Sequence, residues 1–313
     1  MNDTEKPAGW ERQVLEKLAL SAIQEQRRAR HWSILFKTLG FLYLFILLFL
    51  AMGWIGSDGV SVKEHTALVD LKGVISADQA SADSIIMSLQ DAFEDKKTKG
   101  VVLRINSPGG SPVQAGQIYD EIRRLRAKYP KTPLYAVVDD ICASGGYYVA
   151  VGADRIFVDK ASIVGSIGVL MDGFGFTQTM EKLGIERRLL TAGDNKGFLD
   201  PFSPVDPRQQ AYAKQLLEEI HTQFITVVRE GRGKRLKESP DMFSGLVWSG
   251  QKSIELGLAD AFGNVESVAR DVIKAEEIVD YTRKESLAER LAGRFGASVG
   301  KAMAPFEAEL RVR

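Results

Sequence analysis

Cysteine and histidine are scarce in this chain of 313 residues, which has one cysteine, Cys142, and three histidines. A single cysteine excludes an intrachain disulfide and any metal site built from several cysteines. Three histidines spread along the chain also argue against a histidine-rich metal centre. We therefore expect no metal in the functional site, so its chemistry has to come from other side chains.

A surplus of charge is also absent, because 41 Lys and Arg balance 41 Asp and Glu. Surfaces that bind phosphate backbones need an excess of cations, so this balance gives no support for a nucleic-acid partner. Hydrophobic residues make up 45% of the chain. That content and the length allow a full core, in one large domain or two.

One long segment without charge stands out, 38-TLGFLYLFILLFLAMGWI-55. With residues 32–37 it is long enough to cross the hydrocarbon core of a bilayer, which takes about 20 apolar residues. A buried core helix is one alternative, but such a helix rarely lacks a polar face. A cleaved signal peptide is another, because residues 51–53 resemble a small-x-small cleavage site; the long segment before the run favours an uncleaved anchor. We predict a transmembrane helix over residues 32–55.

The cations near this segment lie mainly on its N-terminal side, at Arg27, Arg28, Arg30 and Lys37, whereas the first cation after it is Lys63. The positive-inside rule then predicts that an amphipathic N-terminal segment, residues 1–31, lies in the cytoplasm. A polar linker over residues 56–65 and the rest of the chain are expected on the other side.

Beyond the linker, strand-like and helix-like segments alternate. This rhythm predicts an α/β domain with parallel strand pairing and right-handed crossovers. Strands are expected at 66–75, 100–105, 134–138 and 155–158, and helices at 83–93, 113–128, 144–152 and 207–229. A C-terminal helical tail, residues 276–313, carries an apolar residue at every fourth position from 287 to 303.

Two glycine-bearing turns follow predicted strands, 105-INSPGG-110 and 143-ASGG-146. The ends of neighbouring parallel strands emerge at one edge of a sheet, so we expect the two turns to meet there. Glycines leave backbone N–H groups unobstructed, and such donors bind phosphate or a developing oxyanion. Ser144 is therefore either a helix N-cap, which is the commoner role, or a nucleophile.

A serine nucleophile needs a base, and the histidines are poorly placed to act as one. They lie before the predicted span, in the linker and in mid-helix, at His31, His65 and His221. Cys142 is an alternative nucleophile, although a lone cysteine beside a strand end is more typical of packing. A desolvated lysine can accept the serine proton. Lys196, in the Gly/Asp/Pro-rich segment 191–204, is the best-placed lysine.

Five motifs in this order resemble the bacterial signal peptide peptidase A family over residues 66–265. They are INSPGG, ASGGYYVAVGADRIF, ASIVGSIGV, NKGFLDPFSP and VWSGQKSIELGLAD. The resemblance implies a Clp/crotonase-like α/β fold, a repeated ββα spiral, here over a peptidase domain at residues 66–275. It also implies a Ser–Lys dyad, with Ser144 as the nucleophile and Lys196 as the general base. Because one SPGG and one SGG copy occur in the sequence, the chain resembles the family's short form.

Further expectations come from the same resemblance. Ser166 matches a serine that hydrogen-bonds the lysine, and the oxyanion donors would be the N–H of Gly145 with that of Gly109 or Gly110. Short members resemble membrane-anchored homo-oligomers in which the lysine can reach the serine of a neighbouring subunit. Substrates would be signal peptide remnants or other apolar, extended peptides, and their cleavage would need no cofactor. The protein would be anchored in the bacterial cytoplasmic membrane, with its catalytic domain on the periplasmic or extracellular side.

Two other functions remain alternatives on the sequence. A crotonase-type acyl-CoA enzyme would share the fold and the oxyanion donors, but it would need catalytic carboxylates and a nucleotide site. A non-catalytic membrane scaffold on a peptidase fold would be expected if Ser144 or Lys196 were missing, and both are present. We therefore predict a single-pass membrane serine peptidase.

Overall fold

The computed structural model describes residues 10–51 and 63–283. The chain divides into two compact units, one of which spans residues 61–283, and each is described by itself. The predicted apolar stripe at 287–303, the end of the predicted span at 52–55 and most of the predicted linker lie outside the described residues.

The described part of the first unit is one uninterrupted helix, α1 (Trp10–Ala51), which covers most of both the predicted cytoplasmic segment and the predicted span. At 1.5 Å per residue its 42 residues measure about 63 Å, roughly twice the hydrocarbon thickness of a bilayer. Among the described helices, only this one contains a stretch, Glu16–Phe49, long and apolar enough to cross a membrane. Large apolar side chains on it, such as Leu44 and Phe45, are exposed. The prediction of a long apolar N-terminal helix is confirmed, with the character of a membrane anchor or a signal sequence.

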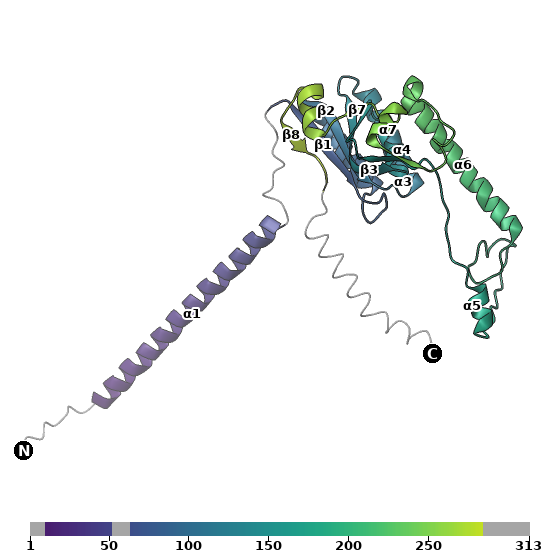
Figure 1. The fold of residues 1–313 in the computed structure, drawn as a ribbon. Helices are drawn as coiled ribbons and strands as arrows, with labels where there is room; N and C mark the ends of the chain where they lie inside the picture. The colour runs from purple at the N-terminus through teal and green to yellow at the C-terminus, as the bar shows by residue number, and fades with distance from the viewer. Residues whose placement is uncertain (1–9, 52–62, 284–313) are drawn as a thin grey trace, which may run out of the picture. The chain divides into compact units, whose positions relative to one another are not determined.

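The second unit alternates strands and helices much as predicted (Figure 1). Its strands are β1 (His65–Lys72), β2 (Thr98–Ser107), β3 (Leu134–Ala143), β4 (Arg155–Val158), β5 (Ile163–Gly165), β6 (Val247–Ser249), β7 (Ala261–Phe262) and β8 (Ile278–Asp280). Its α-helices are α2 (Ala82–Glu94), α3 (Pro112–Lys128), α4 (Gly145–Ala150), α5 (Thr177–Lys182), α6 (Pro207–Arg232), α7 (Gly250–Glu255) and α8 (Val265–Ser267). A short 3₁₀ helix, η1 (Gly233–Arg235), and a π-helical turn, η2 (Val268–Ile273), complete it.

Within the described domain the strands form one sheet with the order β6-β5-β3-β2-β1-β8. The long strand β3 changes partner along its length. Its first half pairs with β4, which in turn pairs with β7, and its second half, from Ile141 to Ala143, pairs with β5. These pairs are parallel except for β5 with β6. The predicted α/β architecture with parallel pairing and crossover helices is confirmed.

The central strands are nearly continuous apolar runs because both faces of the sheet are covered, as is typical of parallel sheets. On β1, Val69 and Leu71 face the main core under α2, α3 and α4, whereas Leu68 faces a smaller cluster that contains Val265 and Val268. Helices α2 and α3 begin at serines whose hydroxyls accept a first-turn N–H, Ser81 and Ser111. The core thus fixes the carboxyl ends of β2 and β3, where the site lies.

Between β5 and α6 the chain leaves the body of the domain in an arm, which we define as residues 168–206 (Figure 1). The arm carries α5, and most of its residues are exposed. Helix α6 then brings the chain back to the body, where Phe224 packs on Tyr148 of α4 with ring centroids 5.1 Å apart.

The end of α6 is held by a buried ion pair. Arg232, 1% exposed, donates two hydrogen bonds to the Asp260 carboxylate, at 2.9 and 2.8 Å, and one to the Gly257 carbonyl. Asp260 also accepts the backbone N–H of Ile156 on β4 at 2.7 Å. Burial alone would raise the pKa of Asp260, but the hydrogen bonds and charge of Arg232 outweigh it, so its pKa is lowered. The pair therefore ties α6 to the sheet through groups that must stay charged.

Replacing Arg232 by Ala should lower the free energy of unfolding by about 3 kcal/mol, because the largely buried Asp260 carboxylate loses its two-bond partner. It then keeps only the more exposed Arg235, which donates to it at 3.2 Å. The measurement is urea unfolding of the full-length protein in detergent. Arg229→Ala is the matched control: its ion pair with Glu238 is half-exposed, so about 1 kcal/mol or less is expected. Since the Asp260 pKa is lowered on folding, the pair stabilises at neutral pH, and that contribution should be lost as the pH falls through the lowered value. Equal losses in the two variants would contradict this account.

Candidate active site

The two glycine-bearing turns lie against each other at the carboxyl ends of β2 and β3. These strands are parallel neighbours, and Ser107 at the end of one pairs with Cys142 near the end of the other. Gly109 has φ +103°, and a Cβ there would lie 2.7 Å from both the Gly145 nitrogen and the Ser144 Cβ. Only glycine tolerates that backbone angle and that close approach. The contact between the turns depends on Gly109.

Ser144 has a strained backbone, with φ 52° and ψ −123°. Non-glycine residues in such regions cost of order 1–3 kcal/mol and occur mainly where the surroundings hold them. Here the Ser144 N–H donates to the Gly165 carbonyl of β5 at 2.9 Å, and its carbonyl accepts the Tyr148 N–H. Ser144 occupies the N-cap position of α4, but its hydroxyl makes no capping hydrogen bond. The capping interpretation therefore does not account for this side chain.

The backbone N–H groups around Ser144 are not equivalent. That of Gly109 donates to the Ser107 hydroxyl at 3.1 Å. Those of Gly110 and Gly145 have no hydrogen-bond acceptor among the described residues. The two are close, since a Cβ on Gly145 would lie 3.3 Å from the Gly110 nitrogen. Gly110 and Gly145 thus present two free donors beside Ser144.

A cleft of about 610 Å³ opens over these groups. Its walls come from both glycine turns, the start of the arm and α6, and they are largely apolar. The lining residues are Pro108, Gly110, Pro112, Ala115, Ser144, Gly145, Tyr148, Ser166, Gly168, Val169, Leu170, Ile220, Gln223, Phe224, Ser244 and Gly245. Among these described lining residues there is no lysine, histidine, aspartate or glutamate. The cleft holds a serine and hydrogen-bond donors, but no base of its own.

Ser166 lines the same cleft as Ser144. It follows β5 directly and also has a positive φ, 53°. Its N–H donates to the Leu246 carbonyl at 2.7 Å, and its carbonyl accepts the Gly168 N–H. The two serines with strained backbones are therefore brought to one cavity by the pairing of β3 with β5.

Lys196 is not brought to this cleft within the chain. It is exposed and lies on a turn of the arm, where its N–H donates to the Gly193 carbonyl. Its neighbours Asp194 and Gly197 line a different cavity, of about 840 Å³, between the arm and the start of α6. Of the residues expected to form the site, the structure brings Ser144, Ser166, Gly109, Gly110 and Gly145 together, and leaves Lys196 apart.

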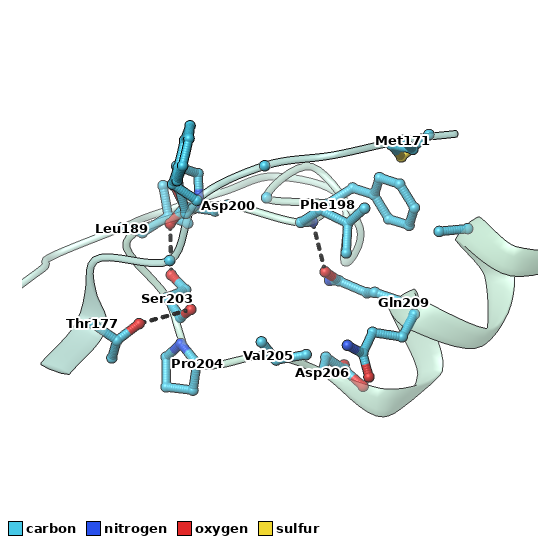
Figure 2. Close-up of a pocket in the computed structure, with 18 of the residues that line it drawn as sticks. Met171, Thr177, Leu189, Phe198, Asp200, Ser203, Pro204, Val205, Asp206 and Gln209 are labelled. Carbon is cyan, nitrogen blue, oxygen red and sulfur yellow. Dashed lines mark hydrogen bonds between the residues drawn. The ribbon is translucent and has the colours of Figure 1, made fainter. Parts of the chain in front are cut away.

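Figure 2 shows how the arm is held around that second cavity. Thr177 donates to the Ser203 carbonyl, Ser203 donates to the Asp200 carboxylate, and the Leu199 N–H donates to Gln209 of α6. Large apolar side chains nevertheless remain exposed along the arm, including Leu190 at 96% and Phe174 at 81%. The arm is a defined structure with an unusually apolar surface.

Two of the histidines and the cysteine are placed as structural residues. His65 begins β1, one residue before the expected strand, and is fully buried, with its ring bound to the Lys63 carbonyl and the Tyr281 hydroxyl. His221 on α6 hydrogen-bonds the Ile167 carbonyl at 3.1 Å, and His31 lies on α1 in the other unit. Cys142 is buried, and burial raises the pKa of its thiol.

Sequence reasoning gave no role to the serine and the isoleucine that hold the first glycine turn. Ser107 accepts the Gly109 N–H, and the Ile75 N–H donates to the Gly109 carbonyl at 2.8 Å. The available signal was the serine placed just before the Pro-Gly-Gly run. The Ile75 contact joins segments more than thirty residues apart, and no local pattern in the sequence indicates it.

Two family models match the chain. The model of peptidase family S49 matches residues 126–279, and the Clp protease model matches residues 60–164. Both matches include Ser144. With the mostly parallel sheet described above, they confirm the predicted Clp/crotonase-like fold.

Similar proteins come from several organisms. The "Na(+)/H(+) antiporter NhaA" of Brucella melitensis is 47% identical over 70% of this chain. The chain spans only 28% of that protein's length, so most of the antiporter lies outside the region of similarity. The "Putative signal peptide peptidase SppA" of Enterococcus faecium is 28% identical over 71% of this chain and 64% of its own length. A protein of Methanocaldococcus jannaschii whose name calls it a putative protease is 31% identical over 68% of this chain and 70% of its own length. The chain therefore belongs to peptidase family S49, serine peptidases of the signal peptide peptidase type that use a Ser–Lys dyad.

Proposed function

We propose that this chain is a membrane-anchored serine endopeptidase that cleaves extended apolar peptides, remnant signal peptides among them. Ser144 is the nucleophile and Lys196 the general base. The observation that carries the proposal is the cleft itself. It combines a strained serine whose hydroxyl makes no capping hydrogen bond with two free backbone donors at its side.

The reaction begins when the Ser144 hydroxyl attacks the peptide carbonyl carbon and its proton passes to the Lys196 side-chain nitrogen. The carbonyl C=O double bond becomes a C–O⁻ single bond in the tetrahedral intermediate. Collapse of that intermediate breaks the C–N bond, and the Lys196 ammonium gives its proton to the leaving amine. Water then attacks the Ser144 ester with Lys196 again as the base, and Ser144 recovers its proton.

The N–H groups of Gly110 and Gly145 stabilise the oxyanion. They are adjacent and have no other acceptor among the described residues, whereas the Gly109 N–H is occupied by Ser107. Donors that are fixed before the reaction stabilise the charged intermediate without reorganisation, which makes them a large part of catalysis. Of the two glycines that the sequence left open, Gly110 is therefore the donor, rather than Gly109.

The base comes from a neighbouring subunit. The cleft has no base among its described lining residues, and Lys196 is exposed on an arm that lines a different cavity. A second copy whose arm reached this cleft would supply Lys196 beside Ser166, and Ser166 would hydrogen-bond the lysine amine. It would also cover exposed apolar side chains such as Leu190 and Phe174, which favours a homo-oligomer.

The substrate class follows from the cleft and the anchor. Tyr148, Ile220 and Phe224 give the cleft an apolar wall, and the described lining carries no charged side chain to attract a charged residue of the substrate. An α1 embedded in the bilayer would keep the domain near apolar peptides in or at the membrane. The family assignment favours this reading over the acyl-CoA enzyme, and the two free donors favour it over a non-catalytic scaffold.

Ser144→Ala and Lys196→Ala should each reduce cleavage of a fluorogenic apolar peptide to background in full-length protein purified in detergent. Mixed and reassembled in equal amounts, the two variants should recover roughly a quarter of wild-type activity, because half the sites keep Ser144 and half of those face an intact Lys196. Mixing cannot restore a dyad formed within one chain. No recovery from reassembled oligomers would contradict the intersubunit base, and activity in unmixed Ser144→Ala would contradict the nucleophile.

Gly109→Ala should lower kcat/KM by about 100-fold or more, because the added Cβ pushes the two glycine turns apart and displaces both Ser144 and the oxyanion donors. Gly116→Ala on α3 is the matched control, since a Cβ there meets nothing within 4 Å. Circular dichroism checks that both variants fold, and labelling of Ser144 by a fluorophosphonate reports the site. A Gly109→Ala enzyme as active as Gly116→Ala would rule out this geometry.

With an epitope at each end of the chain, protease added to intact bacterial spheroplasts should remove the C-terminal epitope and spare the N-terminal one. The expectation rests on the cations before the apolar run, which favour a cytoplasmic N-terminus. Permeabilised cells, in which both epitopes should be lost, are the control. Epitopes on separate fragments before protease is added would instead indicate a cleaved signal sequence, and a protected C-terminal epitope would reverse the orientation.

A further inference from the structure

Ser107 is a fully buried serine at the end of β2, next to the irregularity in the pairing of β2 with β3. Its hydroxyl oxygen accepts the Gly109 N–H at 3.1 Å. It is absent from the described lining of the cleft, so it does not reach a bound peptide. Any effect of this hydroxyl on the reaction must therefore pass through the glycine turn.

The next peptide unit, between Gly109 and Gly110, is held from its other end. The Gly109 carbonyl accepts the Ile75 N–H at 2.8 Å, and the Ile75 carbonyl accepts the Ser111 N–H at 2.8 Å. This peptide is trans, as is every described one. In a trans peptide the N–H points opposite to the C=O. The Gly110 N–H is therefore directed away from the Ile75 N–H that holds the carbonyl, and its nitrogen lies close to Gly145.

We propose that Ser107 is a positioning residue for the oxyanion hole. By accepting the Gly109 N–H it fixes the orientation of the Pro108–Gly109 peptide, and Ile75 fixes the orientation of the peptide after it. Together these bonds remove the Gly109 N–H from the cleft and present that of Gly110 instead. This inference rests on the proposed function of Ser144, Gly110 and Gly145.

The Ser107 hydroxyl is needed because the backbone at Gly109 and Gly110 is flexible. Gly109 and Gly110 both have positive φ, 103° and 147°, in a region where glycine backbones move freely. Without the Ser107 oxygen, the buried Gly109 N–H loses its acceptor, and an unpaired buried donor drives the peptide to turn toward another one. Such a turn tilts the Gly110 N–H from the position that the oxyanion takes in the transition state. Substrate binding to the walls of the cleft is left unchanged.

The experiment compares Ser107→Ala with a matched control, Ser162→Ala, in full-length protein in detergent. Ser162 is also buried, and its hydroxyl also accepts a backbone N–H, that of Asp159 at 3.0 Å, but it does not line the Ser144 cleft. Ser107→Ala should lower kcat by about 10- to 100-fold, less than deletion of a donor, with KM unchanged. Ser162→Ala should leave kcat unchanged even though it loses more thermal stability than Ser107→Ala, because the Ser162 hydroxyl also donates to the Asp139 carbonyl at 2.6 Å.

Two further readouts separate positioning from a purely structural role. A peptide aldehyde, whose adduct with Ser144 carries the oxyanion, should bind Ser107→Ala more weakly by the same factor as kcat falls. The pH dependence of kcat should keep its shape, because the base is untouched. Ser107→Cys, which keeps a weak acceptor of similar size, should recover part of the loss.

Unchanged kcat and aldehyde affinity in Ser107→Ala would overturn the proposal, as would a loss that falls on KM or is matched by Ser162→Ala. Failure of the underlying function is distinguishable, because wild-type protein would then show no fluorophosphonate labelling that depends on Ser144. Labelling that persists in Ser107→Ala at a reduced rate supports the inference.

Discussion

The close contact of two glycine turns is the constraint on which the rest of this site depends. Parallel pairing of β2 with β3 brings both strand ends to one edge of the sheet, but it does not by itself bring two backbones within reach of a single oxygen atom. That approach is possible because a side chain is missing at Gly109, where a Cβ would collide with Ser144 and Gly145. The relative positions of Ser144 and the two N–H donors therefore depend on the absence of a Cβ at Gly109.

Strain is concentrated at the same place. Four described non-glycine residues have positive φ, and two of them, Ser144 and Ser166, line the cleft. Each is held by backbone hydrogen bonds to a neighbouring strand or loop, from Ser144 to Gly165 and from Ser166 to Leu246. The short strands β5 and β6 therefore act as a support that keeps two serines in conformations they would not adopt alone. His65, at the start of β1, is buried and hydrogen-bonded away from this site, and Cys142 packs in the core beneath it.

Much of this could be predicted from the sequence because the signals were local. Apolar runs ahead of the glycine turns gave β2 and the first half of β3, and the helix expected over 113–128 is α3, which begins one residue earlier. What local patterns could not give is which N–H of the first turn stays free, since that depends on the Ser107 hydroxyl and on a bridge to Ile75. The separation of Lys196 from Ser144 could not be predicted from their spacing in the sequence either. The mixed polar and apolar composition of the arm does not indicate where the arm lies relative to the cleft.

The separation of Lys196 from Ser144 also bears on the activity of a single chain before assembly. A newly made chain carries the nucleophile and the oxyanion donors in one cleft. On our proposal, its base lies on an arm that reaches the cleft of a neighbouring subunit. On that proposal a single chain is inactive, and activity depends on the concentration of copies. Peptide cleavage would then begin only at a local concentration high enough for assembly. Chains that are still folding or widely separated would not cleave one another.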